Sequence, residues 1–266
     1  MSDNRPIGVF DSGLGGLTVV KELKKLLPNE SIVYFGDTGR VPYGTRSDET
    51  ILRYAREDEA FLLEQNVKLI VAACGTVSSV AYMTSEELPV PFIEVVNPAA
   101  ESAVEATKTG RIGVIGTPAT INSRAHARAV LKRLTDAVIV ANACPLFVPL
   151  VEEGWIDADD EVTYNTAKRY LAPIIEGRVD TLILGCTHYP ALEKVIANIM
   201  GDGVTLINMG TSVAQKVKAT LESTNSFADK VTVDKYYVSD RAASFSAIAK
   251  NLLGHNIEEC VEQVKL

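Results

Sequence analysis

The chain has 266 residues, of which 47 % are hydrophobic and 23 % are charged, and its formal net charge is −8 at neutral pH. This composition is that of a folded globular protein with one large domain or two of moderate size, and it excludes a largely disordered chain. The negative charge argues against non-specific binding to nucleic acid or anionic membranes, so the expected ligand is a small metabolite.

Short β-branched runs alternate with longer amphipathic segments from the N-terminus onward. This alternation is typical of α/β proteins, in which helices cover both faces of a parallel sheet. The predicted strands lie at residues 7–10, 32–35, 69–73, 92–95, 112–115, 137–140, 181–184 and 205–207. The predicted helices lie at residues 17–27, 48–65, 99–107, 125–134, 161–176 and 191–200. A helix at 212–221, a strand at 230–238 and a helix ending near 253 precede a C-terminal tail.

The predicted strands form two sets of four that correspond element by element. Residues 7–13 resemble residues 112–118, and residues 91–96 resemble residues 204–209. Two copies favour a pseudo-symmetric pair of α/β lobes with mainly parallel sheets over a repeat array. The segment after the second set has no counterpart, so we expect it to return to the first lobe. The predicted lobes are residues 1–97 plus 210–266 and residues 98–209.

Two cysteines occupy matching positions in the two sets. Cys74 and Cys186 each end an apolar run, seven positions after Val67 and Val179 respectively. Because ligands of open α/β sheets bind beyond the carboxyl ends of the strands, we expect the two thiols to face each other across an interlobe cleft. A helix start after each thiol would favour the thiolate, which is the reactive form. The alternative is that each cysteine only fills the end of its sheet.

Four further residues are candidates for the same site. Asp11 follows the first strand, where it could be a carboxylate near the thiols or an N-cap of the first helix. His188 could act as an acid or polarise a substrate carboxylate, or it could bond only to the backbone at a helix start. Tyr43 and Gly44 could offer a hydroxyl and an unhindered N–H to a substrate, although turn formation alone also explains the glycine.

No metal and no cofactor are predicted. A zinc site of Cys74, Cys186 and His188 lacks a further ligand at a characteristic spacing. The glycine-rich segment 11–16 departs from the GxGxxG pattern of nucleotide-binding loops. The four cysteines form no CxxC pair, so we expect free thiols in a reducing compartment. The sequence shows no signal peptide and no apolar run of membrane-spanning length, which predicts a cytoplasmic protein.

Several motifs in the chain resemble those of the bacterial glutamate racemases, which belong to the cofactor-independent aspartate/glutamate racemase superfamily. These motifs follow the family order over most of the chain, and together they are highly specific. They are Val9-Phe-Asp-Ser-Gly-Leu-Gly-Gly-Leu-Thr18, Tyr34-Phe-Gly-Asp-Thr38, Arg40-Val-Pro-Tyr-Gly-Thr45, Cys74-x-Thr76, Ile115-Gly-Thr-Pro-Ala-Thr120, residues 144–154 and Leu184-Gly-Cys-Thr-His-Tyr-Pro190.

The resemblance implies a reaction and the residues that perform it. Cys74 would remove the α-proton of the D-enantiomer, and Cys186 would remove that of the L-enantiomer from the opposite face. Asp11 and His188 would assist these transfers. The implied substrate contacts are Asp11, Ser12, Tyr43, Gly44, Gly75, Thr76, Thr117, Thr120, Thr187 and His188. The resemblance also implies a homodimer without a cofactor, whose product D-glutamate feeds peptidoglycan synthesis.

The residue types fit this chemistry independently of the resemblance. Inversion of a stereocentre requires proton removal on one face and delivery on the other, which two thiols can do and a single fixed base cannot easily do. Backbone N–H groups and hydroxyls near Ser12, Thr76 and Thr187 are suited to stabilising the charge that develops on the substrate carboxylate.

The chain departs from the family pattern directly after the first thiol. Where the family usually has Cys-Asn-Thr, this chain has Cys74-Gly75-Thr76, so a side-chain amide is absent. Two alternatives therefore stay open. The first is a racemase of aspartate or a related amino acid, and the second is a binding or regulatory relative with weak catalysis. The presence of both thiols, Asp11 and His188 favours an enzyme.

Overall fold

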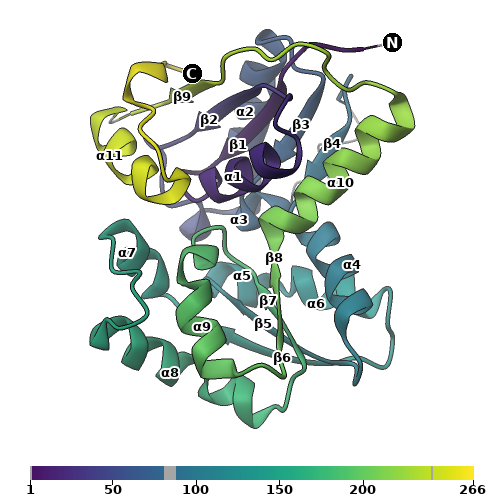
Figure 1. Ribbon diagram of the computed structural model, residues 1–266, viewed down its shortest axis with the longest axis vertical. Coiled ribbons are helices and arrows are strands. Elements are labelled where there is room, and N and C mark those ends of the chain that lie inside the picture. The colour runs from purple at the N-terminus through teal and green to yellow at the C-terminus, as the bar shows by residue number, and fades with distance from the viewer. Residues whose placement is uncertain (1, 81–87, 241) are drawn as a thin grey trace.

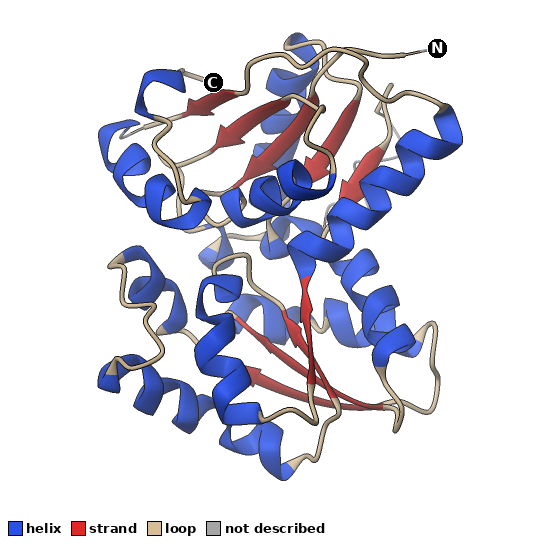
Figure 2. Ribbon diagram, in the orientation of Figure 1, coloured by secondary structure: helices blue, strands red, loops and turns tan. Residues whose placement is uncertain are grey.

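The computed structural model of the chain describes residues 2–80, 88–240 and 242–266. It contains two β-sheets, one above the other in Figure 1, and helices lie in front of and behind the upper sheet (Figure 2). Every strand pair in the described residues is parallel. The predicted α/β class with parallel sheets is therefore confirmed.

The two sheets share one strand order. The upper sheet runs β10-β9-β2-β1-β3-β4 and the lower sheet runs β6-β5-β7-β8, so the order β2-β1-β3-β4 recurs as β6-β5-β7-β8. The upper strands are β1 (Ile7–Asp11), β2 (Ile32–Gly36), β3 (Leu69–Ala72), β4 (Phe92–Glu94), β9 (Lys235–Val238) and β10 (Val261–Gln263). The lower strands are β5 (Arg111–Gly116), β6 (Val138–Ala143), β7 (Thr181–Leu184) and β8 (Thr205–Asn208). The predicted correspondence between the two sets of strands is thus present in the topology.

Helices connect the strands. They are α1 (Leu17–Leu26), α2 (Asp48–Glu64), α3 (Gly75–Ser78), α4 (Val96–Ala106), α5 (Pro118–Ser123), α6 (Ala125–Leu131), α7 (Phe147–Glu152), α8 (Glu161–Glu176), α9 (Glu193–Met200), α10 (Met209–Thr224) and α11 (Ala242–Leu253). Single 3-10 turns are η1 (Tyr43–Thr45), η4 (Tyr189–Leu192) and η5 (Glu258–Cys260). The long helices α2 and α8 begin after Ser47 and Asp160, whose side chains accept a hydrogen bond from an N–H of the first turn.

Alternating side chains of the upper strands build two apolar layers. Ile7 and Val9 of β1 pack in the cluster that includes α1, whereas Phe10 packs with the residues of α2 on the opposite face. The cluster on the α1 side continues into the lower sheet, and α10 packs against both α1 and α4. Because β4 leads into α4 and β8 leads into α10, the chain crosses twice between the sheets. These crossings hold the carboxyl ends of the two sheets next to each other.

The structure differs from the predictions mainly near the C-terminus. The predicted strand at 230–238 forms only over Lys235–Val238, because Val231 and Val233 are 65 % and 77 % exposed and contribute nothing to the sheet. The tail contains an unpredicted short strand, β10, which pairs with β9. The predicted helix at 191–200 is divided into η4 and α9. No helix in the described ranges is long and apolar enough to cross a membrane.

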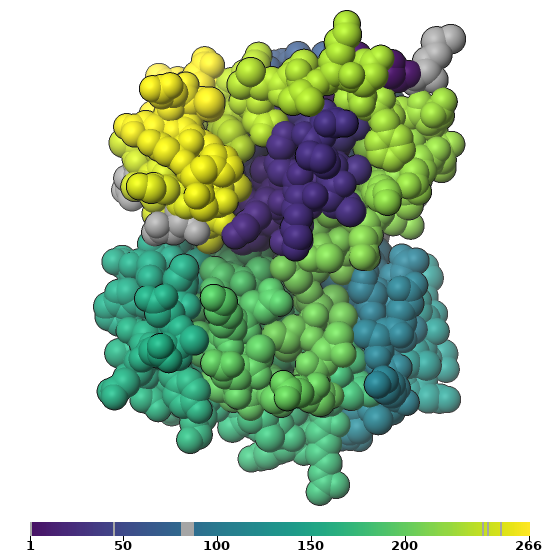
Figure 3. All heavy atoms as spheres, viewed as in Figure 1, coloured from purple at the N-terminus to yellow at the C-terminus, as the bar shows by residue number. Residues whose placement is uncertain are grey.

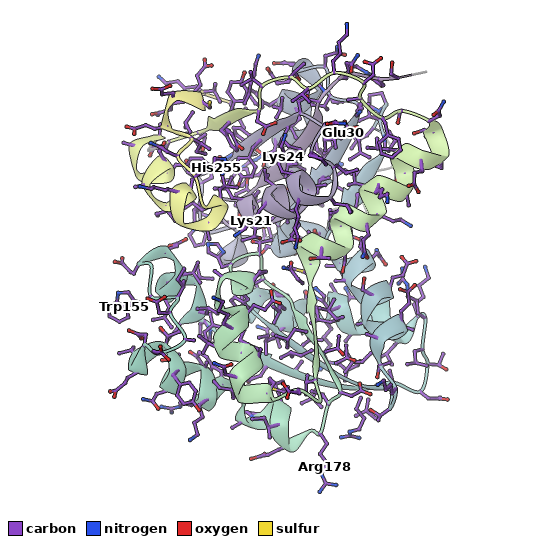
Figure 4. The ribbon with its side chains drawn as sticks, viewed as in Figure 1. Lys21, Lys24, Glu30, Trp155, Arg178 and His255 are labelled. Atoms are coloured by element: carbon purple, nitrogen blue, oxygen red, sulfur yellow. The ribbon has the colours of Figure 1, made fainter. Side chains whose placement is uncertain are left out.

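A buried ion pair lies at the amino end of the upper sheet, opposite the end that carries the cysteine. Glu30, labelled in Figure 4, lies 2.6 Å from the Lys68 ammonium, and both side chains are almost fully buried. The same ammonium donates to the carbonyl oxygens of Asp3 and Ser226. These bonds attach the N-terminal segment and the segment after α10 to the sheet, and removal of one charged partner is expected to be strongly destabilising.

Acid is expected to destabilise the protein through His126. This residue of α6 is buried, and neither ring nitrogen has a hydrogen-bond partner among the described residues. Burial lowers the pKa of His126 from 6.5 to about 4. Between these two pH values the unfolded chain therefore binds a proton at this histidine and the folded protein does not. The free energy of unfolding should therefore fall by about 3 kcal/mol from this group as the pH decreases from 6.5 to 4.

The measurement is urea unfolding of wild type and His126→Leu at several pH values between 7 and 4. The variant should lose less stability than wild type over this range. Parallel pH profiles for the two proteins would show that His126 does not titrate as its burial requires.

Candidate active site

A cleft of about 490 Å³ lies where the carboxyl ends of the two sheets meet. Every residue that the sequence predicted for the site lines this cleft. From the upper side these are Asp11, Ser12, Tyr43, Gly44, Cys74, Gly75 and Thr76, and from the lower side Thr117, Thr120, Cys186, Thr187 and His188. Residues separated by more than 100 positions are thus brought together by the two parallel sheets.

Cys74 follows β3 and lies beside the loop after β1. Its thiol donates to the Ser12 hydroxyl at 3.3 Å. The Asp11 carboxylate in turn accepts from the backbone N–H groups of Gly13 and Gly16, at 3.2 and 3.0 Å. Asp11 therefore orders the loop before α1 and lines the cleft near the thiol, but it is not the N-cap of α1, because Gly16 occupies that position.

Burial dominates the electrostatics at Cys74. Burial raises the pKa of this thiol to about 12, and the neighbouring charge of Asp11 acts in the same direction. Burial also raises the pKa of Asp11 above its usual range. The N–H of Val77 in α3 lowers the pKa of the thiol, as expected for a helix start, but burial outweighs this effect. A cation that enters the cleft would lower the pKa of the thiol.

Cys186 has a different partner. The His188 Nδ1 atom lies 3.9 Å from the Cys186 sulfur, and His188 Nε2 lies 3.2 Å from a carboxylate oxygen of Glu152. Burial acts to lower the pKa of His188, but the bonds to Cys186 and Glu152 outweigh it and raise the pKa to about 10. These partners favour the protonated form of His188, and its Nδ1 atom is positioned for proton transfer with the Cys186 sulfur.

Glu152 is a candidate site residue that the sequence analysis missed. It is the last residue of α7, within the motif 144–154, and it lines the cleft. The only signal in the sequence is a carboxylate at the end of a short apolar helix. Its partner His188 lies 36 positions away, and no local pattern connects the two.

Tyr43 contributes to the cleft differently from the prediction. Its hydroxyl donates to Asp37 and lies 3.1 Å from Asp58, so its proton is not offered to a substrate. Arg40 pairs with both of these carboxylates and joins the loop to α2. The cluster thus fixes the loop so that the tyrosine ring and the backbone of Gly44 line the cleft.

The remaining polar groups of the cleft are mainly hydroxyls and backbone N–H groups. Thr117 caps α5 by accepting from the Thr120 N–H at 3.2 Å, and their hydroxyls lie 3.0 Å apart. Among the described residues that line the cleft, none is Lys or Arg. The described part of the chain also contains no group of three or more His, Cys, Asp or Glu that could hold a metal ion. Neutral donors and His188 are therefore the groups that can receive an anionic ligand here.

The family model described as Asp/Glu/Hydantoin racemase matches residues 7–217, which include both cysteines of the cleft. This chain belongs to the Asp/Glu/Hydantoin racemase family. A curated glutamate racemase of Syntrophus aciditrophicus is 45 % identical over 264 residues, which cover 98 % of this chain and 97 % of the relative. The family resemblance predicted from the motifs is therefore confirmed.

Solved structures of this racemase family share the fold. The crystal structure of a glutamate racemase from Bacillus anthracis matches with a TM-score of 0.93 at 37 % identity, covering 99 % of this chain and 98 % of that chain. The glutamate racemase of Francisella tularensis in complex with D-glutamate matches with a TM-score of 0.89, also at 37 % identity and with the same coverage. The two-lobed fold predicted for this chain is thus that of known family members.

Proposed function

We propose that this chain is a glutamate racemase that interconverts L- and D-glutamate by proton transfer at the α-carbon, without a cofactor. The observation that carries the proposal is the placement of Cys74 and Cys186 after equivalent strands, β3 and β7, in one cleft. The near full-length similarity to glutamate racemases supports glutamate as the substrate.

In this mechanism each thiol serves one face of the α-carbon. Cys74 removes the proton of D-glutamate and Cys186 removes that of L-glutamate, while the other thiol delivers a proton to the opposite face. The ammonium of a bound amino acid brings a positive charge toward the buried Asp11 and Cys74, and this charge lowers the pKa of the Cys74 thiol from about 12. On the other face, the His188 imidazolium donates a proton to Cys186 after Cys186 has delivered its own proton to the α-carbon, and the neutral His188 ring accepts the Cys186 proton before Cys186 acts as the base.

The substrate carboxylates are held by neutral donors. Hydroxyls and N–H groups at Ser12, Thr76 and Thr187 are positioned at the cleft wall, where they stabilise the negative charge that develops on the α-carboxylate. Gly44 on the upper side of the cleft and Thr117 and Thr120 on the lower side supply further contacts.

Gly75, where the chain departs from the family pattern, lies close to the second lobe. A Cβ atom at this position would lie 3.3 Å from the Gly185 carbonyl oxygen across the cleft and 3.6 Å from the Thr120 hydroxyl. The position is therefore crowded by the second lobe, and glycine allows the lobes to approach closely.

Side chains at position 75 are expected to reduce activity. Gly75→Ala should lower kcat/KM for glutamate about 3- to 10-fold, because the lobes must separate slightly to accept the Cβ atom. Gly75→Asn should also lower kcat/KM for glutamate, but by a smaller factor, since its amide can regain a substrate contact. The measurement is kcat/KM for both enantiomers of glutamate and aspartate.

Gly203→Ala is the matched control, because no described atom lies within 4 Å of a Cβ atom at that position. An increase of kcat/KM for glutamate in Gly75→Asn would contradict the crowding argument and show that the missing amide limits binding.

The proposed function is tested by circular dichroism of pure L-glutamate incubated with the protein in the presence of a chelator and without added cofactor. The expected result is complete loss of the signal as D-glutamate forms. Turnover of aspartate well above that of glutamate would favour the aspartate alternative. No turnover of either amino acid would favour a binding or regulatory protein.

We also propose that residues 1–97 with 210–266 and residues 98–209 form the two lobes, and that the protein is a cytoplasmic homodimer. The pairing of β9 with β2 and of β10 with β9 supports the first assignment. Light scattering at several protein concentrations tests the dimer, and a monomer at all concentrations would exclude it.

A further inference from the structure

The loop that leads into α1 meets the second lobe directly behind the cleft. A Cβ atom at Gly15 would lie 2.2 Å from the Thr187 hydroxyl oxygen and 2.6 Å from His188 Nδ1. Real Cβ atoms essentially never approach another heavy atom closer than 3.0 Å. The backbone at Gly15 is not in the left-handed region, so glycine is required by the neighbouring lobe and not by local conformation.

Thr18 makes a second contact from the same turn. Its hydroxyl lies 2.7 Å from the Thr187 carbonyl oxygen and 2.9 Å from the Gly15 carbonyl oxygen, and the side chain is buried. A single hydroxyl proton therefore bridges the two lobes. Figure 3 shows the purple surface of this N-terminal region against the green surface of the second lobe, and Lys21 of α1 lies near this boundary in Figure 4.

These contacts surround His188. Gly15 packs against its ring, Glu152 bonds to Nε2, and Cys186 lies beside Nδ1. The ring therefore cannot move away from Gly15 without changing its distance to Cys186 or to Glu152. Close packing of this kind transmits small shifts, because a packed interior has little free space.

We propose that Gly15 and Thr18 are positioning residues that set how closely the two lobes approach, and that they thereby hold His188 and Cys186 in place relative to Cys74. This inference rests on the proposed racemase function. It predicts that a change at Gly15 or Thr18 impairs proton transfer on the Cys186 face more than on the Cys74 face.

Gly15→Ala is the first test. We expect kcat to fall about 10- to 100-fold with a smaller change in KM, because misplacement of a catalytic group by about 1 Å has an effect of this size. Gly203→Ala is again the control and should keep wild-type kcat, since its Cβ atom meets no described neighbour.

Isotope effects distinguish displacement of the groups on the Cys186 face from partial unfolding of the variant. With α-deuterated L-glutamate, Cys186 removes the deuteron, so a slower step at Cys186 should increase the isotope effect on kcat/KM. With α-deuterated D-glutamate, Cys74 removes the deuteron and Cys186 delivers a solvent proton, so the isotope effect should decrease. A variant that is only less well folded would shift both isotope effects in the same direction or leave them unchanged.

Thr18 supplies a second pair of variants. Thr18→Val keeps the shape but removes the bridging proton, and should lower kcat about 3- to 10-fold with the same isotope pattern. Thr18→Ser keeps the hydroxyl and should restore kcat to nearly the wild-type value. Equal activity of the valine and serine variants would overturn the role of the hydroxyl.

A crystal structure of Gly15→Ala without substrate tests the geometry independently of the reaction. The expected result is a displaced His188 ring or a wider gap between α1 and residues 187–188. An unmoved ring together with wild-type kcat would overturn the inference. A wild-type protein that does not racemise glutamate would overturn the proposed function instead, and the crystal structure would still decide whether Gly15 sets the approach of the lobes.

Discussion

Replacing Cys74 or Cys186 by serine is expected to abolish racemisation in both directions. A serine hydroxyl is a far weaker acid than a thiol and cannot serve as a base at neutral pH, so each variant lacks proton transfer on one face of the substrate. Loss of one acid/base group should lower kcat by about 100- to 10,000-fold. The measurement is the rate of loss of circular dichroism starting from each pure enantiomer of glutamate.

The exposed thiol of Cys260 provides the matched control, because it lies outside the cleft and Cys260→Ser should keep wild-type activity. Each inactive variant should still exchange the α-proton of one enantiomer with solvent, L-glutamate for Cys74→Ser and D-glutamate for Cys186→Ser. Near wild-type racemisation in either cysteine variant would exclude the two-thiol assignment.

His188→Asn is expected to produce the second largest loss, about 100-fold in kcat. The asparagine amide can take the place of Nδ1 beside Cys186, but it cannot carry a proton between that sulfur and the solvent. Glu152→Gln should have a smaller effect of about tenfold, because the ring remains while its charged partner is lost. The measurement is kcat in both directions for the two variants.

The free energy of unfolding of each variant must be compared with that of wild type, since protonated His188 also stabilises the folded state. The pKa of His188 is raised from 6.5 to about 10, so its contribution to the free energy of unfolding is fully present below pH 6.5 and is lost as the pH rises through about 10. Unfolding measured below pH 6.5 therefore shows the full stability cost of each substitution. A well folded His188→Asn protein with near wild-type kcat would show that Cys186 exchanges protons without this histidine.

The strands and the two thiols could be predicted from the sequence because their signals are local. The apolar runs before Cys74 and Cys186 match β3 and β7, and both runs are fully buried because helices cover both faces of each sheet. The internal correspondence predicted two similar sets of strands, and the structure adds that both sets have the same order in their sheets. Short helices such as α5 and α7 escaped prediction, since six residues are too few to show a clear periodicity.

The features that the sequence could not provide depend on tertiary structure. The high pKa of Cys74 follows from burial, which outweighs a helix start that the sequence did indicate. The hydroxyl of Tyr43 is bonded to Asp37 and Asp58, and this cluster forms only when α2 packs beside the loop. The contact of Gly15 with His188 likewise joins residues from opposite lobes.

The central claim, that two thiols act on opposite faces of one α-carbon, is tested most directly by racemisation of L-glutamate in deuterium oxide. The measurement is the deuterium content at the α-carbon of both enantiomers during the first few per cent of the reaction. If two bases act, each newly formed D-glutamate molecule carries a solvent deuteron, which the Cys74 thiol delivers. The remaining L-glutamate keeps its original α-proton. D-glutamate that retains the original proton would show that one base removes and returns it, and would contradict this account.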